Sequence, residues 1–181
     1  MATGLTLKGP GFIRYPRGTA VGTPIKEFPE VMEVGKAERR QEGSDIDIWA
    51  IGSMVADAER LAARLSEHGI EAGVVNARFV KPLDIDLLKT SAAGCNLLVT
   101  MEDHVVTGGL GTAVSDALQE ANFLRPVERI GWPDTFIDHG SSVAKLREEY
   151  GLSAESILER VLERYKKIQA KSDPAKQGVS E

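Results

Sequence analysis

The sequence predicts a three-layer α/β/α domain with a mostly parallel sheet. Short apolar segments of strand length occur at residues 46–50, 72–75, 97–101 and 127–130. Between them lie segments whose apolar residues recur at helical spacing. Strands that alternate with helices form βαβ units, whose right-handed crossovers place helices on both faces of a parallel sheet. The charged segment 36–40 predicts one further, antiparallel strand, whose charges protect the sheet edge.

The first strand shows the two-residue alternation of a sheet, because Ile46, Ile48 and Ala50 alternate with Asp47 and Trp49. A helix is expected next, with Ser53 as its N-cap and Gly69 as its C-terminal stop. Its apolar positions have helical spacing; they are Val55, Ala58, Leu61, Ala62 and Leu65.

The segment VNARFVKPLD (75–84) predicts a rigid connection from the second strand to a capped helix. Pro82 fixes its own backbone and keeps Lys81 extended, so the strand ends before them. Asp84 is placed to accept amide hydrogens from the first turn of a helix at 85–92. The strand at 97–101 is apolar throughout, which predicts burial on both faces.

The second half of the chain continues the alternation of helices and strands. Helices are expected at residues 111–121, 142–150 and from 153 or 154 to about 170. The last of these carries a continuous apolar stripe, formed by Ile157, Leu158, Val161, Leu162, Tyr165 and Ile168. The polar residues 171–181 are expected to be a disordered tail.

Composition limits the kinds of partner and compartment. The net charge of −5 indicates neither a nucleic-acid nor a membrane-surface partner, and no apolar run approaches the length of a membrane span. The first residues lack the features of a secretory signal. A single cysteine, Cys95, excludes an internal disulfide and fits a reducing compartment. We therefore expect a cytoplasmic protein in which Cys95 is buried and inert.

Polar residues that follow the 97–101 strand are candidates for chemistry. The glycines at 108, 109 and 111 could place backbone amides against a phosphate, but TGGLGTAV lacks the GxGxxG and P-loop patterns. A tight, closely packed strand-to-helix turn is the preferred interpretation. Glu102, Asp103 and His104 do not converge, because neighbouring strand residues face opposite ways. Glu102 could hold the loop or an interface; a solvated or salt-bridged acid is preferred.

The histidines and N-terminal arginines give weaker signals. His139 stands in an acidic loop without a nucleophile or metal motif, so a structural role is preferred. His68 suits a helix C-terminus. Arg17 follows Pro16 and precedes Gly18, so a rigid corner could present its guanidinium to a phosphate or carboxylate. From the residues alone, a surface ion pair is preferred for Arg17.

Several blocks of sequence, taken in order, resemble the C-terminal part of the 1-deoxy-D-xylulose 5-phosphate synthase family. They are GPGFIRYPRG (9–18), NARFVKPLD (76–84), LLVTMEDHVVTGGLGTAV (97–114), IGWPDTFIDHGS (130–141) and YGLSAESI (150–157). The resemblance covers roughly Gly9 to Leu162. The chain departs from the family pattern at Asp103-His104, where the family usually has Glu-Asn, and at Trp132, where it usually has Leu.

The resemblance implies a function that the residues alone do not. Members of this family, which are similar to transketolase, condense pyruvate with D-glyceraldehyde 3-phosphate on thiamine diphosphate and Mg²⁺, releasing carbon dioxide and supplying isoprenoid biosynthesis. The last arginine of YPRG contacts the substrate phosphate, so this role is expected for Arg17. Arg14 and Tyr15 match the motif as well, and no contact is assigned to them.

The resemblance also implies which parts of the enzyme must come from elsewhere. The chain has no Gly-Asp-Gly metal motif and no segment for the glutamate that activates thiamine. We expect residues 1–30 to end the preceding pyrimidine-binding domain and form a linker, and 31–170 to form the transketolase C-terminal-like domain. The complete enzyme is expected to be a homodimer that binds thiamine diphosphate and Mg²⁺ through its N-terminal domains. This chain alone is expected to bind neither and to be inactive, as a truncated piece, a gene fragment or one part of a split enzyme.

Two other interpretations remain open. The chain could be the equivalent domain of another thiamine enzyme, a transketolase or an oxoacid dehydrogenase β-subunit. It could also be a non-catalytic module that binds a phosphorylated ligand at the 108–111 loop or at Arg17. The roles of Glu102, His104 and His139 are left open.

Overall fold

A five-stranded, mostly parallel sheet forms the centre of the protein, which a computed structural model describes at residues 2–15, 27–138 and 140–172. In this part of the chain the strand order is β1-β3-β2-β4-β5. The strands are β1 (Glu38–Gln41), β2 (Ile46–Ala50), β3 (Ala72–Asn76), β4 (Leu97–Val105) and β5 (Val127–Trp132). Only β1 is antiparallel to its neighbour β3. The predicted sheet and its antiparallel edge strand are confirmed.

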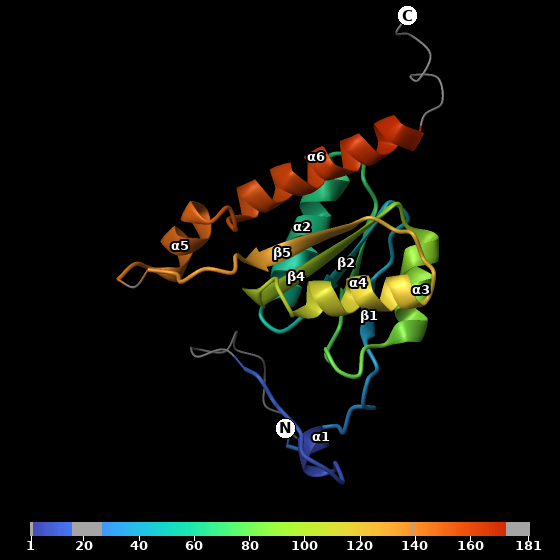
Figure 1. Cartoon of the computed structure of the whole chain (residues 1–181), viewed down its shortest axis with the longest axis vertical. Coiled ribbons are helices and arrows are strands. Elements are labelled where there is room, and N and C mark those ends of the chain that lie inside the picture. Colours follow the sequence, from blue (N-terminus) through green and yellow to red (C-terminus); the bar gives the residue numbers. More distant parts are fainter. Residues whose placement is uncertain (1, 16–26, 139, 173–181) are drawn as a thin grey trace, which may run out of the picture.

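Helices cover both faces of this sheet, which gives the expected three layers (Figure 1). On one face lie α2 (Met54–Glu67) and α6 (Ala154–Ser172), and on the other lie α3 (Ile85–Gly94) and α4 (Leu110–Glu120). Each face has its own apolar core. The first is formed by α2, α6 and side chains such as Ile48 and Val99, and the second by α3, α4 and side chains such as Trp49 and Leu98. Strand residues that alternate along β2 and β4 therefore serve different cores, and both strands are buried on both faces.

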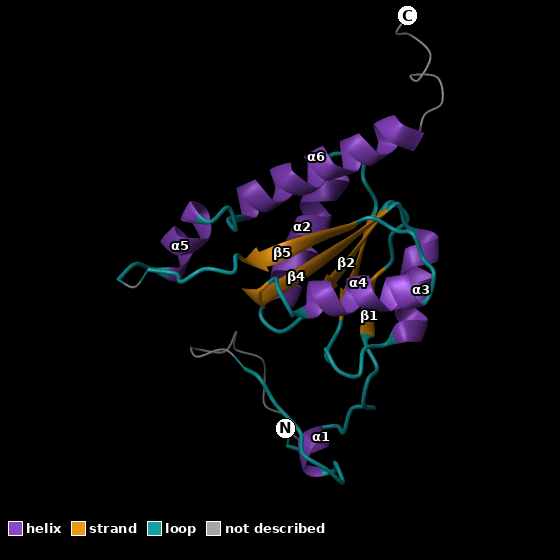
Figure 2. Cartoon of the chain, viewed as in Figure 1, coloured by secondary structure: helices purple, strands orange, loops and turns teal. Residues whose placement is uncertain are grey.

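Two short helices lie outside the layers. Helix α5 (Val143–Glu149) follows β5, and the Ser142 hydroxyl accepts a hydrogen bond from the Lys145 amide at its start. Helix α1 (Ala2–Leu5) belongs to an N-terminal segment that extends away from the sheet (Figure 2). Residues 11–15, expected to be extended, form no strand.

Some expected helix and strand ends differ from the structure. Ser53 precedes α2, but its own backbone is helical and its side chain makes no capping bond, so the predicted N-cap is wrong. Gly69, by contrast, ends α2 with a φ of 72°, a conformation that glycine adopts without strain. Strand β4 runs four residues beyond the predicted Met101, because the polar residues after it still pair with β5 at Val105 and Trp132. Helix α6 extends to Ser172, and the remainder of the expected tail lies outside the described residues.

The connection from β3 to α3 has the predicted cap. The Asp84 carboxylate accepts the Leu87 amide at 3.2 Å and, with its other oxygen, the Ala37 amide at 3.1 Å. Asp84 is 6% exposed and lies 3.6 Å from the Lys36 ammonium group. One carboxylate therefore caps α3 and also holds the residue directly before the edge strand β1.

A buried ion pair also holds the edge strand. The Arg39 guanidinium of β1 donates to the Asp47 carboxylate of β2 at 2.6 Å and to the Ser91 hydroxyl of α3 at 3.1 Å. Asp47 is 2% exposed, and burial raises the pKa of its carboxyl although Ser91 and Arg39 oppose the shift. The positive charge of Arg39 therefore helps to attach β1 to β2 and α3, in addition to the protection that charged residues give to the sheet edge.

We expect Cys95 to resist alkylation in the folded chain. It is 4% exposed, and burial, with a smaller contribution from the charge of Asp47, raises the pKa of its thiol from 9.0 to about 11. At pH 8 this leaves about a hundredfold less thiolate than an ordinary thiol would have. The reaction with iodoacetamide, followed by mass spectrometry, should be slow in buffer and fast in guanidinium chloride. Equal rates under both conditions would show that Cys95 is accessible.

Candidate functional site

A crevice of about 280 Å³ opens at the carboxyl ends of β2 and β4. From β2 the chain crosses to β3, and from β4 it crosses to β5 on the other side, so the strand order reverses here. Open α/β sheets bind ligands at such points. The walls come from four loops or element ends and from the N-terminal segment; they are Ile51 to Ser53, Val80, Glu102 to His104, Gly108 to Leu110, and Arg14 with Tyr15.

The buried Glu102 side chain caps the start of α4. Its carboxylate accepts the Leu110 amide at 2.8 Å and the Gly111 amide at 2.9 Å. The side chain is only 4% exposed, so the preferred interpretation of a solvated or salt-bridged acid is wrong and the loop-holding alternative is correct. A negative charge at this position also interacts favourably with the positive end of the helix dipole. Because these two amides already bind a carboxylate, they are not free to bind a phosphate.

Three glycines at or just before the start of α4 stand where a side chain would be unfavourable, each for its own reason. A Cβ atom on Gly109 would lie 1.9 Å from Glu102 Oε2, and one on Gly111 would lie 2.8 Å from Thr100 Oγ1. Gly108 has a φ of 74°, which is the left-handed region. The interpretation of this loop as a tight, closely packed turn is therefore confirmed.

The residues that follow Glu102 diverge, as the strand geometry predicts. The Asp103 carboxylate turns toward β5 and α5, where it accepts the Trp132 indole N–H at 2.8 Å and lies 3.3 Å from the Arg147 guanidinium. His104 is exposed, and its ring Nδ1 lies 2.9 Å from the Val105 carbonyl oxygen. These three side chains therefore do not form one catalytic group. Of the residues expected to depart from the family pattern, Asp103 and Trp132 contact each other, whereas His104 does not take part in this contact.

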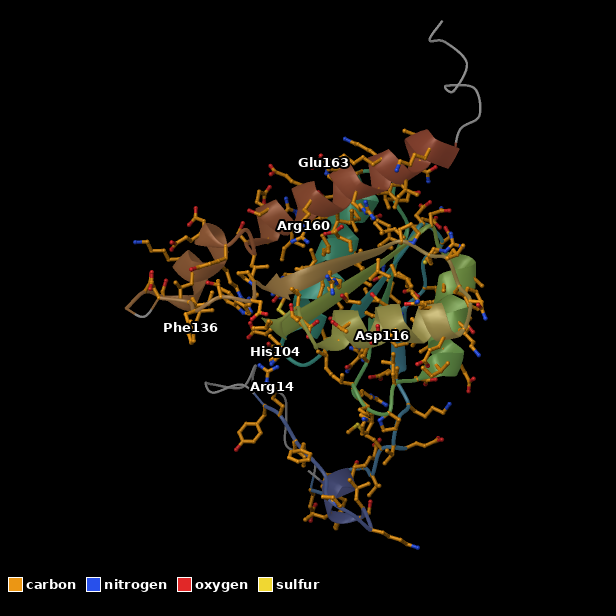
Figure 3. The ribbon with its side chains drawn as sticks, viewed as in Figure 1. Arg14, His104, Asp116, Phe136, Arg160 and Glu163 are labelled. Atoms are coloured by element: carbon orange, nitrogen blue, oxygen red, sulfur yellow. The ribbon has the colours of Figure 1, made fainter. Side chains whose placement is uncertain are left out.

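Arg14 connects the N-terminal segment to the crevice. Its guanidinium donates to the Asp103 carbonyl oxygen at 3.0 Å, and Figure 3 shows the side chain reaching from the segment toward the end of β4 near His104. Sequence reasoning assigned Arg14 no contact. No local signal could have found it, because its partner is 89 residues away in the chain.

Arg17 and His139 lie outside the described residues. In the sequence Arg17 follows Tyr15 by two positions, and Tyr15 lines the crevice. The remaining histidine, His68, is the C-cap residue of α2, in agreement with its expected place at a helix end.

A second set of residues was missed by sequence reasoning. Arg60, Arg64 and Arg147 come from α2 and α5, and they line a separate cavity of about 520 Å³. Helical spacing on α2 places its two arginines on one face, four residues apart. The contribution of Arg147 could not be found locally, since α5 follows α2 by more than seventy residues of chain.

Replacement of Glu102 by alanine should destabilise the fold. The change removes the acceptor for two buried amides, and we expect a loss of about 2–3 kcal/mol in the free energy of unfolding. Urea denaturation followed by circular dichroism measures this. Glu163→Ala is the matched control, because Glu163 is an exposed acid of α6 that pairs with the exposed Lys167 (Figure 3). Equal effects of the two changes would contradict the role of Glu102.

Gly109→Ala should also destabilise the chain, although its φ of −93° suits any residue. The new methyl group must displace the Glu102 carboxylate, and we expect a cost of about 1–3 kcal/mol. Gly94→Ala is the control, because a Cβ there meets no atom within 4 Å. The same urea experiment should find Gly94→Ala close to the unchanged chain, whereas a neutral Gly109→Ala would show that the loop can relax.

Comparison with known proteins places this architecture in a family. Residues 35–157 match the family described as "Transketolase, C-terminal domain". The 1-deoxy-D-xylulose-5-phosphate synthase of Thermomicrobium roseum is 48% identical over 163 residues, which cover 90% of this chain and 26% of that protein. The protein of the same name from Acidobacterium capsulatum is 44% identical over 161 residues, or 89% of this chain and 26% of that protein. The chain thus spans about a quarter of the length of these relatives.

Solved structures give a consistent result. A split gene transketolase, described as an inactive beta4 tetramer, matches with a TM-score of 0.67 and 36% identity over 76% of this chain and 43% of that chain. A transketolase from Pichia stipitis matches with a TM-score of 0.54 over 73% of this chain and 18% of that chain; its 18% identity supports the fold alone. The chain belongs to the transketolase C-terminal domain family, and it corresponds to the C-terminal part of the 1-deoxy-D-xylulose-5-phosphate synthases.

Proposed function

We propose that this chain supplies the C-terminal part of an enzyme that makes 1-deoxy-D-xylulose 5-phosphate from pyruvate and D-glyceraldehyde 3-phosphate. Eight relatives, 41–48% identical over at least 85% of this chain, share the name of that synthase. The observation that carries the proposal is the crevice at the carboxyl ends of β2 and β4, which Arg14 and Tyr15 of the N-terminal segment help to line. The chain would thereby contribute to a site that is completed by other domains.

Within this enzyme, we assign Arg17 to the phosphate of the aldehyde substrate. It occupies the last arginine position of the YPRG motif, and an arginine fork matches the oxygens of a phosphate. The described loop before α4 offers no competing phosphate site, because Glu102 occupies the Leu110 and Gly111 amides. Arg14 donates to the Asp103 carbonyl, and this contact supports a defined approach of the segment to β4.

The residues described here do not fit thiamine diphosphate and Mg²⁺. They contain no group of three or more acidic, histidine or cysteine side chains able to hold a metal ion. The helix start that could face a diphosphate is closed by Glu102. We therefore assign the cofactor and its metal to the N-terminal domains of the complete enzyme, and we expect this chain alone to be inactive.

The expected partners are those missing domains, in the same or a separate chain, and a second copy of the complete enzyme in a homodimer. Large apolar side chains of the N-terminal segment support a covering partner, since Phe12 is 100% exposed and Phe28 is 82% exposed. No described helix is long and apolar enough to cross a membrane. The proposed location is the cytoplasm, with no nucleic-acid partner.

The second candidate function is that of a transketolase, which the 36% identity to a split gene transketolase favours. The two functions differ in the donor substrate. The chain assembled with its own thiamine-binding domains should consume pyruvate with glyceraldehyde 3-phosphate and release carbon dioxide. Turnover of a ketose donor, without use of pyruvate, would select the transketolase function instead.

Arg17→Ala in the assembled enzyme should raise the KM for glyceraldehyde 3-phosphate. The loss of one charge-assisted pair corresponds to about 1.5–3 kcal/mol, or about a ten- to hundredfold change. The KM for pyruvate should change little, because pyruvate carries no phosphate. Steady-state kinetics with each substrate varied in turn measure both constants.

Arg164→Ala serves as the matched control, because Arg164 is a half-exposed arginine of α6 that pairs with Glu128. It should leave both constants unchanged. If Arg17→Ala leaves the KM for the aldehyde unchanged as well, Arg17 is not part of the phosphate site.

A further inference from the structure

A cavity of about 520 Å³ lies between α2, β4, α5 and the start of α6. Figure 2 shows α5 beyond the end of β5 and beside the beginning of α6. The cavity shares none of its lining residues with the crevice at the ends of β2 and β4. Its volume falls within the range of sites for small molecules.

The floor of this cavity is apolar and well ordered by packing. Leu61, Met101 and Ile157 line it, and each is at most 5% exposed because it also belongs to the core beneath α2 and α6. Leu152 and Val143 extend the apolar surface toward α5. Such a floor offers water few hydrogen-bonding groups, so the burial of a ligand's apolar chain against it would be favourable.

The rim is basic. Arg60, Arg64 and Arg147 line the cavity together with a single acid, Asp57. Asp57 pairs with both Arg60 and Arg147, so two guanidinium groups share one carboxylate. Among the residues that line the cavity, the three arginines thus outnumber the one acid, and Glu155 and Asp103 reach Arg64 and Arg147 from outside the lining.

The existing pairs of these arginines can be exchanged for a ligand. The Arg147 guanidinium lies 3.4 Å from Asp57 and 3.3 Å from Asp103, which is longer than a strong charge-assisted hydrogen bond. Arg64 pairs with Glu155, whose side chain is 72% exposed. Exposed ion pairs contribute little to stability, so their rearrangement costs little. Because the arginines already hold carboxylates, a carboxylate is the group that best fits their present geometry.

We propose that this cavity binds a small organic acid, with its carboxylate at the arginine rim and an apolar chain against Leu61, Met101 and Ile157. Arg147 is the main anchor, since its side chain is only 24% exposed. The cavity shares no lining residue with the crevice at the ends of β2 and β4, so its ligand would bind without entering that crevice.

Methionine methyl groups allow a direct test with the chain as it exists. The sequence has four methionines. Met101 lines the cavity, and the Met54 sulfur lies 3.5 Å from the Arg147 guanidinium, whereas Met32 belongs to the N-terminal segment and serves as an internal reference. Hexanoate is titrated into the chain labelled with ¹³C-methyl methionine. We expect saturable shifts of the Met101 and Met54 signals, an unchanged Met32 signal and a dissociation constant on the order of millimolar.

Two matched ligands separate charge from hydrophobic burial. Hexanol keeps the chain but lacks the charge, and acetate keeps the charge but lacks most of the chain. Each should bind at least about tenfold more weakly than hexanoate. Hexanol binding as tightly as hexanoate, or acetate doing so, would overturn the proposal, because the rim or the floor would then contribute nothing.

Variants test the location. Arg147→Gln should weaken hexanoate binding about tenfold or more. Arg160→Gln is the matched control on α6, since Arg160 pairs with Glu128 and does not line the cavity (Figure 3). It should leave binding unchanged.

A second variant fills the cavity without removing a charge. Ala144→Phe places a larger side chain at an exposed position of α5 that lines the cavity, so the fold should tolerate it. It should abolish the hexanoate shift of Met101. Undiminished binding by either Arg147→Gln or Ala144→Phe, or no movement of Met101 in the unchanged chain, would show that the cavity is not the site.

Discussion

The pairing of Glu102 with the start of α4 is the interaction on which the carboxyl end of the sheet depends. One buried carboxylate accepts the Leu110 and Gly111 amides, and Gly109 must lack a Cβ for that carboxylate to fit. The positive end of the helix is thereby neutralised within the chain itself. A glycine-rich loop at this place would otherwise be a ready phosphate site. In the proposals above, arginine side chains bind the anions instead.

Asp103, the next residue, links three parts of the molecule that are distant in sequence. Its carbonyl oxygen accepts Arg14, and its carboxylate accepts Trp132 and lies beside Arg147. The strand alternation makes this possible, because Glu102 turns toward α4 while Asp103 turns toward β5 and α5. Both the crevice at the ends of β2 and β4 and the cavity beside α5 therefore depend on the extension of β4 past Met101.

The fold was more predictable from the sequence than the site. Buried strands such as Ile46–Ala50 have an unmistakable apolar pattern, and Asp84 caps α3 as its position predicts. The extension of β4 could not be predicted, because polar residues after an apolar strand indicate a loop. The burial of Glu102 could not be predicted either, since its compensation comes from amides eight and nine residues later. Arg14 contacts a carbonyl oxygen 89 residues away, for which no local pattern exists.

Asp103 and Trp132, two of the three residues expected to depart from the family pattern, form one structural unit in this fold. A leucine at position 132 would have no side-chain N–H group, so the Asp103 carboxylate would lose its donor at 2.8 Å and would depend on Arg147 alone. The indole also packs edge-on against Tyr150, with ring centroids 5.9 Å apart, directly after α5. Trp132 thus joins β5 to the end of α5 while its N–H fixes Asp103. Arg147 lies on that helix and reaches the same carboxylate. The contact of Asp103 with Trp132 therefore helps to set the position of α5, and with it one wall of the arginine-rimmed cavity.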